Sequence, residues 1–151
     1  MTEPMDAGAL RRLADELEVR NIIARLAQLA DNDGDELRDY LALMTEDAVW
    51  ESRAGTQIIA GSPPRVGHAS IREGALERRR DGVQGPEAGT LHTVNTTVVE
   101  VHGDRATAKS YFMYLRDIHD TARLAHAGAY NDEFRRTPQG WKLARRVLTP
   151  R

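Results

Sequence analysis

The chain has 151 residues, of which 40% are hydrophobic and 29% are charged, and its net charge at pH 7 is −2. A chain of this length can bury about 70% of the surface that its unfolded form exposes, so we expect a single domain over residues 1–151. The small net charge favours neither nucleic-acid binding nor membrane binding, and the lack of cysteine excludes disulfides and thiolate metal ligands.

The cellular compartment is indicated mainly by what the sequence lacks. A chain without cysteine suits a reducing compartment, so we expect a cytoplasmic protein. No stretch approaches the roughly 20 apolar residues of a membrane span. The first residues lack the basic-then-apolar pattern of a signal peptide, and we expect a short frayed tail over residues 1–9.

The first part of the chain is predicted to be helical. Residues 10–30 carry apolar side chains at the spacing of an amphipathic helix with a buried stripe, namely Leu10, Leu13, Leu17, Ile22, Ile23, Leu26 and Leu29. The sequence "DNDGD" then ends this helix. Asp33 is expected to cap a second helix, with Glu36 completing a capping box. That helix is expected to bury Leu37, Tyr40, Leu41 and Met44.

The middle of the chain is predicted to hold short elements. Residues 46–52, "EDAVWES", and residues 56–61, "TQIIAG", are expected to form short strands. Residues 68–80 are expected to form a helix whose basic C-terminal end interacts favourably with the helix dipole. The side chains of the segment "ERRRD" at this end are expected to be solvated. Residues 81–89 contain glycines and a proline, which predicts a loop.

The last part of the chain is predicted to be β-structure. Long strand candidates occupy residues 90–101, 105–118, 121–135 and 140–149. Because the links between them are short, we expect an antiparallel meander. Helices first and strands last indicate an α+β domain with helices packed on one face of a curved sheet.

Side chains on one face of a strand recur every two residues. By this rule Thr90, His92, Val94, Thr96 and Val98 share a face of the first long strand. A β-bulge would invert the faces beyond it, so the period alone does not decide which side chains point inward.

Four segments of the chain occur in a recognisable order. They are "ELEVRNIIARLAQLADNDGDE", "YLALMTEDAVWES", "TLHTVNTTVVEVHGDRATAKSYF" and "GAYNDEFRRTPQGWKLARR". Together they resemble the SnoaL-like branch of the nuclear-transport-factor-2-like superfamily over residues 10–148. The resemblance implies a cone-shaped, curved antiparallel sheet wrapped around a long N-terminal helix, with further short helices. This fold hosts many chemistries and some proteins that are not enzymes.

The motifs are similar to those of scytalone dehydratase, bile-acid 7α-dehydratase and hexachlorocyclohexane dehydrochlorinase. The resemblance implies a dyad of Asp31, at the end of the first helix, and His92, on the first long strand. It also implies a further site arginine, Arg146, five positions after Trp141.

The dyad has a chemical rationale. Imidazole titrates near neutral pH and can abstract a proton next to a leaving group. A carboxylate bonded to the other ring nitrogen fixes the tautomer and stabilises the imidazolium that forms. An arginine on the opposite wall can stabilise a developing oxyanion or a departing anion.

The sequence departs from these relatives at some positions. They carry Tyr or Lys where this chain has Leu26, so a proton donor is missing, which weakens a plain dehydratase interpretation. Asp33 is an alternative partner for His92, and His126 is an alternative base. The residues expected to line the substrate site are Leu26, Trp50, Asn95, Phe112, Tyr114, His126 and Tyr130.

Structural roles compete with each of these interpretations. A histidine in a strand is often a buried residue whose hydrogen bonds are satisfied, Arg146 can pair with a carboxylate, and Trp50 can be a core residue. The histidines show no HxH or HExxH spacing, so we expect no metal. Without a phosphate-binding loop or a nucleophile elbow, we also expect no cofactor.

The functional hypothesis is a cofactor-free lyase or isomerase acting on a small hydrophobic, ring-containing molecule through the His92–Asp31 dyad, with Arg146 assisting. One alternative is a non-catalytic domain that binds a small molecule or acts as an accessory. Another is an epoxide hydrolase or a polyketide cyclase-like enzyme. The outward positions Val99, Val101, Tyr111 and Met113 are more apolar than a solvated face requires, so we expect a homo-oligomer, with a dimer preferred and a trimer as the alternative.

Overall fold

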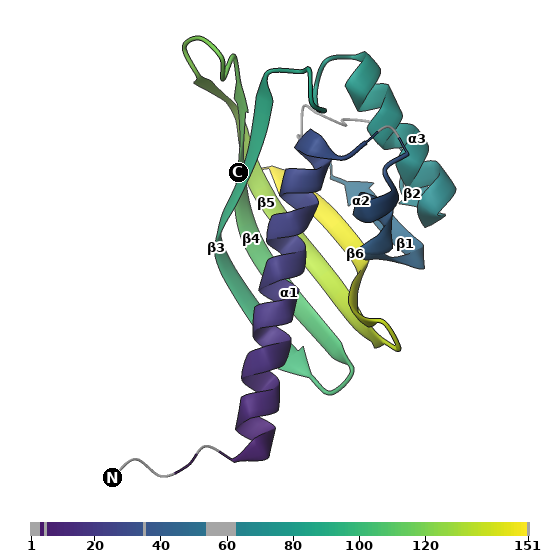
Figure 1. Cartoon of the computed structure of the whole chain (residues 1–151), viewed down its shortest axis with the longest axis vertical. Coiled ribbons are helices and arrows are strands. Elements are labelled where there is room, and N and C mark those ends of the chain that lie inside the picture. Colours follow the sequence, from purple (N-terminus) through teal and green to yellow (C-terminus); the bar gives the residue numbers. More distant parts are fainter. Residues whose placement is uncertain (1–3, 5, 35, 54–62, 151) are drawn as a thin grey trace.

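The computed structural model describes residues 4, 6–34, 36–53 and 63–150, and these form an α+β fold (Figure 1). The elements are α1 (Ala7–Asn32), α2 (Arg38–Ala42), β1 (Met44–Ser52), β2 (Arg65–Val66), α3 (Gly67–Arg80), β3 (Thr90–His102), β4 (Arg105–Arg116), β5 (Arg123–Thr137) and β6 (Gly140–Pro150). The strand expected over residues 56–61 lies outside the described residues. No helix among the described residues is long and apolar enough to cross a membrane.

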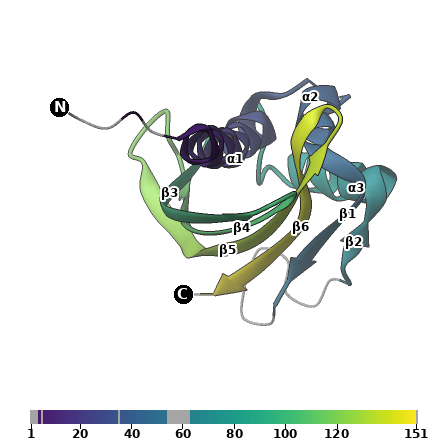
Figure 2. The same cartoon turned by 90° about the horizontal axis from the view of Figure 1, so that it is seen from below.

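The six strands form one curved sheet in the order β2-β1-β6-β5-β4-β3. Strands β3 to β6 make the expected antiparallel meander. Strand β1, however, pairs with β6 in parallel, so the sheet is mixed rather than wholly antiparallel. Figure 2 shows that α1 lies on the concave side of the sheet, which therefore holds the core.

Helix α1 begins at Ala7, earlier than the predicted Leu10, because the side chain of Asp6 accepts a hydrogen bond from the backbone N–H of Ala9 at 2.7 Å. Its first turns project beyond the sheet (Figure 1). Three leucines expected in the buried stripe are exposed, namely Leu10, Leu13 and Leu17. The buried face begins at Asp15 and continues through Val19, Ile22, Ile23, Leu26 and Ala30 to Asp31.

Asp33 caps helix α2 from a distance. It ends α1, and its Oδ2 accepts a hydrogen bond from the backbone N–H of Tyr40 at 2.9 Å. The N-cap position itself is held by Leu37, with a left-handed φ of 53° and no side-chain cap. Glu36 forms no capping box within the described residues; its carboxylate lies 4.0 Å from Arg72. The carboxylate of Asp33 is therefore committed to the start of α2.

A bulge in β3 inverts the two faces of the strand. Thr96 has a φ of 51°, and the register with β4 shifts between Asn95 and Val98. Val99 is consequently buried and Val101 packs against the core, which corrects their predicted outward positions, while Val98 is 59% exposed. Tyr111 and Met113 on β4 do face outward, as expected.

Asp15 ties the first half of α1 to the sheet. Its two carboxylate oxygens accept hydrogen bonds from Arg136 at 2.8 and 2.7 Å, and one of them also accepts from the indole Nε1 of Trp141 at 3.0 Å. The guanidinium of Arg136 lies 4.5 Å from the ring centroid of Trp141. These hydrogen bonds, those of Arg136 first, lower the pKa of Asp15 below its ordinary value of 3.8, although burial acts in the opposite direction.

We predict that Asp15→Asn lowers the free energy of unfolding by about 2 kcal/mol, because hydrogen bonds to a charged partner are lost. The pKa of Asp15 is lower in the folded protein than in the unfolded chain. Asp15 therefore stabilises the fold fully at pH values above its pKa in the unfolded chain, and this stabilisation is lost as the pH falls through its pKa in the folded protein. The difference between wild type and variant should therefore be constant near neutral pH and shrink below about pH 4. Urea unfolding at several pH values measures it; a difference that grows on acidification would contradict the role.

Candidate active site

Asp31 and His92 are in direct contact. Asp31, 2% exposed, lies in the last turn of α1, and His92 lies near the start of β3. One carboxylate oxygen accepts from the backbone N–H of His92 at 2.8 Å, and the other lies 2.7 Å from its Nδ1. Because an ionised carboxylate only accepts hydrogen bonds, Nδ1 carries the hydrogen and Nε2 of a neutral ring is left with a free lone pair.

The ring of His92 lies against an aromatic row that crosses the sheet. Its centroid is 5.0 Å from that of Tyr114, which is stacked at 5.9 Å on His126 of β5. The hydroxyl of Tyr114 donates to the backbone oxygen of Val83 at 2.6 Å, so it is already committed. Of these two predicted site residues, Tyr114 lies beside the ring of His92 and His126 lies behind Tyr114, and neither is among the residues that line the cavity next to His92.

A small cavity lies beside His92 under the C-terminal half of α1. Its wall contains Leu26, Ala27, Ala30, Tyr40, Trp50, Arg78, Gln84, His92, Phe112, Tyr130, Arg146 and Leu148. The centre of a water molecule can occupy about 30 Å³ of it, which is room for about two waters. Five predicted site residues besides His92 are thus brought together. Asn95 is not among them, because it is exposed next to the bulge.

Arg146 forms a buried ion pair on the cavity wall. Its Nε and one terminal nitrogen donate to the two carboxylate oxygens of Asp132 at 2.8 and 2.7 Å. Burial would lower the pKa of Arg146, but the charge and hydrogen bonds of Asp132 outweigh burial and raise it. The guanidinium also lies 3.9 Å from the ring centroid of Tyr130 and 5.2 Å from that of Trp50. Arg146 is therefore a rigid, charge-compensated part of the wall.

Arg78, in the last turn of α3, also reaches this wall, although the sequence predicts a solvated helix end there. Its Nε donates to Oε1 of Gln84 at 3.0 Å, and its guanidinium lies 6.0 Å from the ring centroid of Trp50. It forms no ion pair with any carboxylate among the described residues. Burial lowers its pKa, yet a guanidinium stays charged at neutral pH.

Two phenols complete the polar part of the wall. Burial raises the pKa of Tyr40, and it raises that of Tyr130 to about 12. Both are therefore protonated at neutral pH, and neither hydroxyl has a hydrogen-bond partner among the described residues. The ring of Tyr130 stacks on Phe112 at 4.5 Å, and Phe112 in turn fits because Gly128 beside it has no Cβ, which would lie 2.6 Å from the ring.

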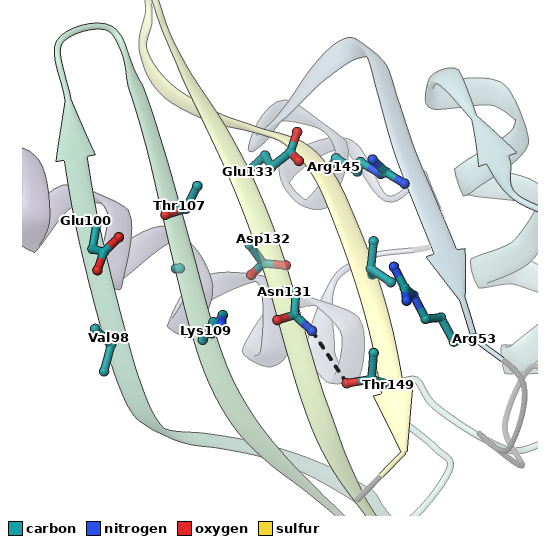
Figure 3. Close-up of a pocket in the computed structure, with 12 residues that line it drawn as sticks. Arg53, Val98, Glu100, Thr107, Lys109, Asn131, Asp132, Glu133, Arg145 and Thr149 are labelled. Atoms are coloured by element: carbon teal, nitrogen blue, oxygen red, sulfur yellow. Dashed lines mark hydrogen bonds between the residues drawn. The ribbon is translucent and has the colours of Figure 1, made fainter.

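A larger hollow, of about 530 Å³, lies on the outer face of the sheet (Figure 3). Its walls carry charged side chains of both signs, including Glu100, Lys109, Glu133 and Arg145. Arg145 donates to Glu51 at 2.7 Å. No histidine lines this hollow, so the candidate acid–base chemistry belongs to the smaller cavity. Among the described residues, no three His, Asp or Glu side chains are grouped as metal ligands.

We predict that Asp132→Asn destabilises the protein by about 3 kcal/mol, because it leaves the buried charge of Arg146 uncompensated. The double variant Asp132→Leu/Arg146→Met removes both charges and should lie much closer to wild type. Urea unfolding of the two variants measures this difference. Equal stabilities of Asp132→Asn and wild type would refute the buried-pair interpretation.

Comparison with known proteins places the chain in a family. Three solved structures from Novosphingobium aromaticivorans are similar to it. A protein described as NTF2-like with a cystatin-like fold is 28% identical, with a TM-score of 0.79 over 95% of this chain and 86% of that one. A protein proposed to be an aromatic ring hydroxylase is 26% identical, with a TM-score of 0.67 over 91% and 90%.

The third, proposed to be a scytalone dehydratase, is 17% identical, with a TM-score of 0.70 over 93% and 86%, and shows likeness of fold alone. No curated protein matches the chain. A model of the SnoaL-like domain, however, matches residues 11–147. The chain therefore belongs to the family of SnoaL-like domains, within the NTF2-like fold.

Proposed function

We propose that this protein is a cofactor-free lyase or isomerase that abstracts a proton from a small hydrophobic, ring-containing molecule. The observation that carries this proposal is the contact of Asp31 with both Nδ1 and the backbone N–H of His92 beside a small cavity. A ring nitrogen with a free lone pair on such a wall is suited to act as a general base.

Each step has a residue that can perform it. Nε2 of His92 takes the proton from carbon, and Asp31 holds the ring and stabilises the imidazolium. The electron pair of the broken C–H bond forms a carbon–carbon double bond. In a lyase reaction this double bond forms as the leaving group departs with the electron pair of its own bond, and Tyr40 or Tyr130 can protonate the leaving group, since both phenols keep their protons at neutral pH. These tyrosines replace the donor that is missing at Leu26.

The lining of the cavity favours a ring-shaped ligand. Leu26, Phe112, Leu148 and the ring of Trp50 provide apolar and aromatic surface. A relative that is 26% identical is proposed to be an aromatic ring hydroxylase, which is consistent with a ring-binding site. A ring compound is larger than the present space, so binding requires side chains of the wall to move apart.

The alternatives differ in what they need. An epoxide hydrolase or a cyclase of that kind needs a carboxylate free to activate water, and no carboxylate is among the described residues that line the cavity. A non-catalytic binding or accessory domain needs the cavity but not the orientation of His92. A measurement of proton transfer therefore distinguishes a non-catalytic binding domain from the proposed enzyme.

We predict that the protein accelerates the exchange of deuterium from D₂O into the acidic C–H positions of cyclic ketones such as 2-tetralone. His92→Ala should lower this rate by about 10²-fold or more, the usual contribution of a general base. Asp31→Asn should lower it by orders of magnitude, because the wrong tautomer is then favoured. Proton NMR measures the exchange.

The matched control is His126→Ala, which removes a strand histidine that does not line the cavity. It should keep the wild-type exchange rate, and His92→Ala should cost only about 1–2 kcal/mol of stability. Exchange no faster than the blank in wild type would favour a non-catalytic binding domain. Exchange equally fast in wild type and His92→Ala would refute His92 as the base and favour another base, such as His126.

We also propose that the protein is a homodimer formed through the outer face of the sheet. Exposed apolar side chains gather there on β3 to β5, namely Leu91, Val98, Tyr111, Met113 and Leu124. Exposed apolar groups of this kind mark association surfaces.

Light scattering at micromolar concentration should give a dimer mass for wild type. Met113→Lys should shift the mass toward the monomer, because it places a charge among these apolar side chains. Leu17→Lys, on the exposed start of α1, should leave the dimer intact. A monomer mass for wild type would contradict the proposal.

A further inference from the structure

Two buried hydrogen-bond donors on the cavity wall have no partner. They are Nε2 of Gln84 and Nε1 of Trp50, and neither is satisfied by any described residue. Buried polar groups without a partner are few in native proteins, and each requires an explanation. Two on the wall of one cavity mark a place where an acceptor is required, and an oxygen of a ligand can supply it in place of water.

The orientation of Gln84 follows from its neighbour. Gln84 is 4% exposed, and its amide oxygen accepts the hydrogen bond from Nε of Arg78. An arginine offers only donors, so the oxygen must face Arg78 and the amide NH₂ must face away from it. The hydrogen bond from Arg78 therefore identifies the unpartnered group of Gln84 as the amide NH₂, which is a donor.

The ring of Trp50 lies near two guanidinium groups, that of Arg146 at 5.2 Å and that of Arg78 at 6.0 Å from its centroid. Its indole N–H has no partner among the described residues. The other tryptophan of the chain behaves differently, because Nε1 of Trp141 donates to Asp15.

The charges of the wall lead to the same conclusion. Arg146 is compensated by Asp132, and His92 is bonded to Asp31. Arg78 has no such carboxylate within the described part of the chain, and no acidic side chain lines the cavity there. A positive charge and two free donors thus belong to the wall of the same cavity.

We propose that Arg78, Gln84 and Trp50 form a subsite for an oxygen atom of the ligand that carries or develops negative charge. Donors held in place in a water-poor site stabilise such an oxygen strongly. The three side chains are linked, since Arg78 bonds Gln84 and lies near the ring of Trp50.

Together with the proposed function, on which this step rests, the subsite also specifies the substrate class. A site that abstracts a proton from carbon and stabilises negative charge on an oxygen atom suits an enolisable ring ketone. The C–H bond next to the carbonyl breaks, and the proton goes to Nε2 of His92. The electron pair forms the carbon–carbon double bond of an enolate, and the negative charge moves to the carbonyl oxygen, which faces Arg78. Return of the proton to another carbon completes an isomerisation, whereas return to the same carbon regenerates the ketone.

The first test uses 4-nitrophenol, whose anion absorbs visible light, so that the ionisation state of the bound probe is observed directly. Wild type should bind the anion at least about tenfold more tightly than the neutral phenol, as expected for hydrogen bonds between a charged donor and an anion. Arg78→Met should remove this preference, and Gln84→Leu should reduce it. Arg80→Met, an exposed arginine of the same helix, is the matched control and should leave it unchanged.

The second readout is the indole N–H signal of each tryptophan in a ¹⁵N NMR spectrum. Adding 4-nitrophenolate should shift the signal of Trp50, while that of Trp141 stays in place because its partner is Asp15. No binding of the probe, equal binding to wild type and Arg78→Met, or a preference for the neutral phenol would overturn the subsite.

The outcome is separable from that of the proposed function. Selective binding of the anion without any deuterium exchange leaves the subsite standing and refutes the enzyme. Exchange that depends on His92, together with equal anion binding in wild type and Arg78→Met, leaves the enzyme standing and refutes the subsite.

Discussion

The carboxylate of Asp31 joins the last turn of α1 to strand β3, and the arrangement of the candidate site depends on this junction. Both oxygens are used on one residue, His92, so the strand position and the ring orientation are fixed together. A helix end offers no backbone donor for this purpose, since its last groups are carbonyls. The connection between the end of α1 and His92 therefore depends on the side chain of Asp31 and not on the helix backbone.

The rest of the cavity divides its charges into compensated and uncompensated groups. Asp132 and Arg146 neutralise one another across β5 and β6, which are paired at these residues. Their contribution is shape, because the guanidinium holds the rings of Tyr130 and Trp50 in place. The charge that remains available to a ligand comes from Arg78 on α3. The arginine at the position that the family resemblance indicates, Arg146, is thus not the arginine whose charge is available to a ligand, which is Arg78.

Local patterns in the sequence predicted the long first helix, α3 and the meander of β3 to β6, but not the short strand β2. The residues of the dyad contact came from the resemblance to a family. The patterns left the partner of His92 open between two aspartates, which the capping of α2 by Asp33 decides. They could not show the parallel pairing of β1 with β6, because it joins segments far apart in the chain. Arg78 was missed for the same reason, since a basic helix end is ordinarily solvated and only tertiary packing brings this side chain, which is partly buried, to the cavity wall.

The bulge at Thr96 explains how one strand can serve both the site and the core. A threonine with positive φ has no signal in the sequence, because such backbone is usually supplied by glycine. Before the bulge, even-numbered residues such as His92 face α1; after it, odd-numbered residues such as Val99 do. A regular strand would point Val99 away from α1 if it pointed His92 toward it. The irregularity thus lets a polar dyad and an apolar core face the same helix.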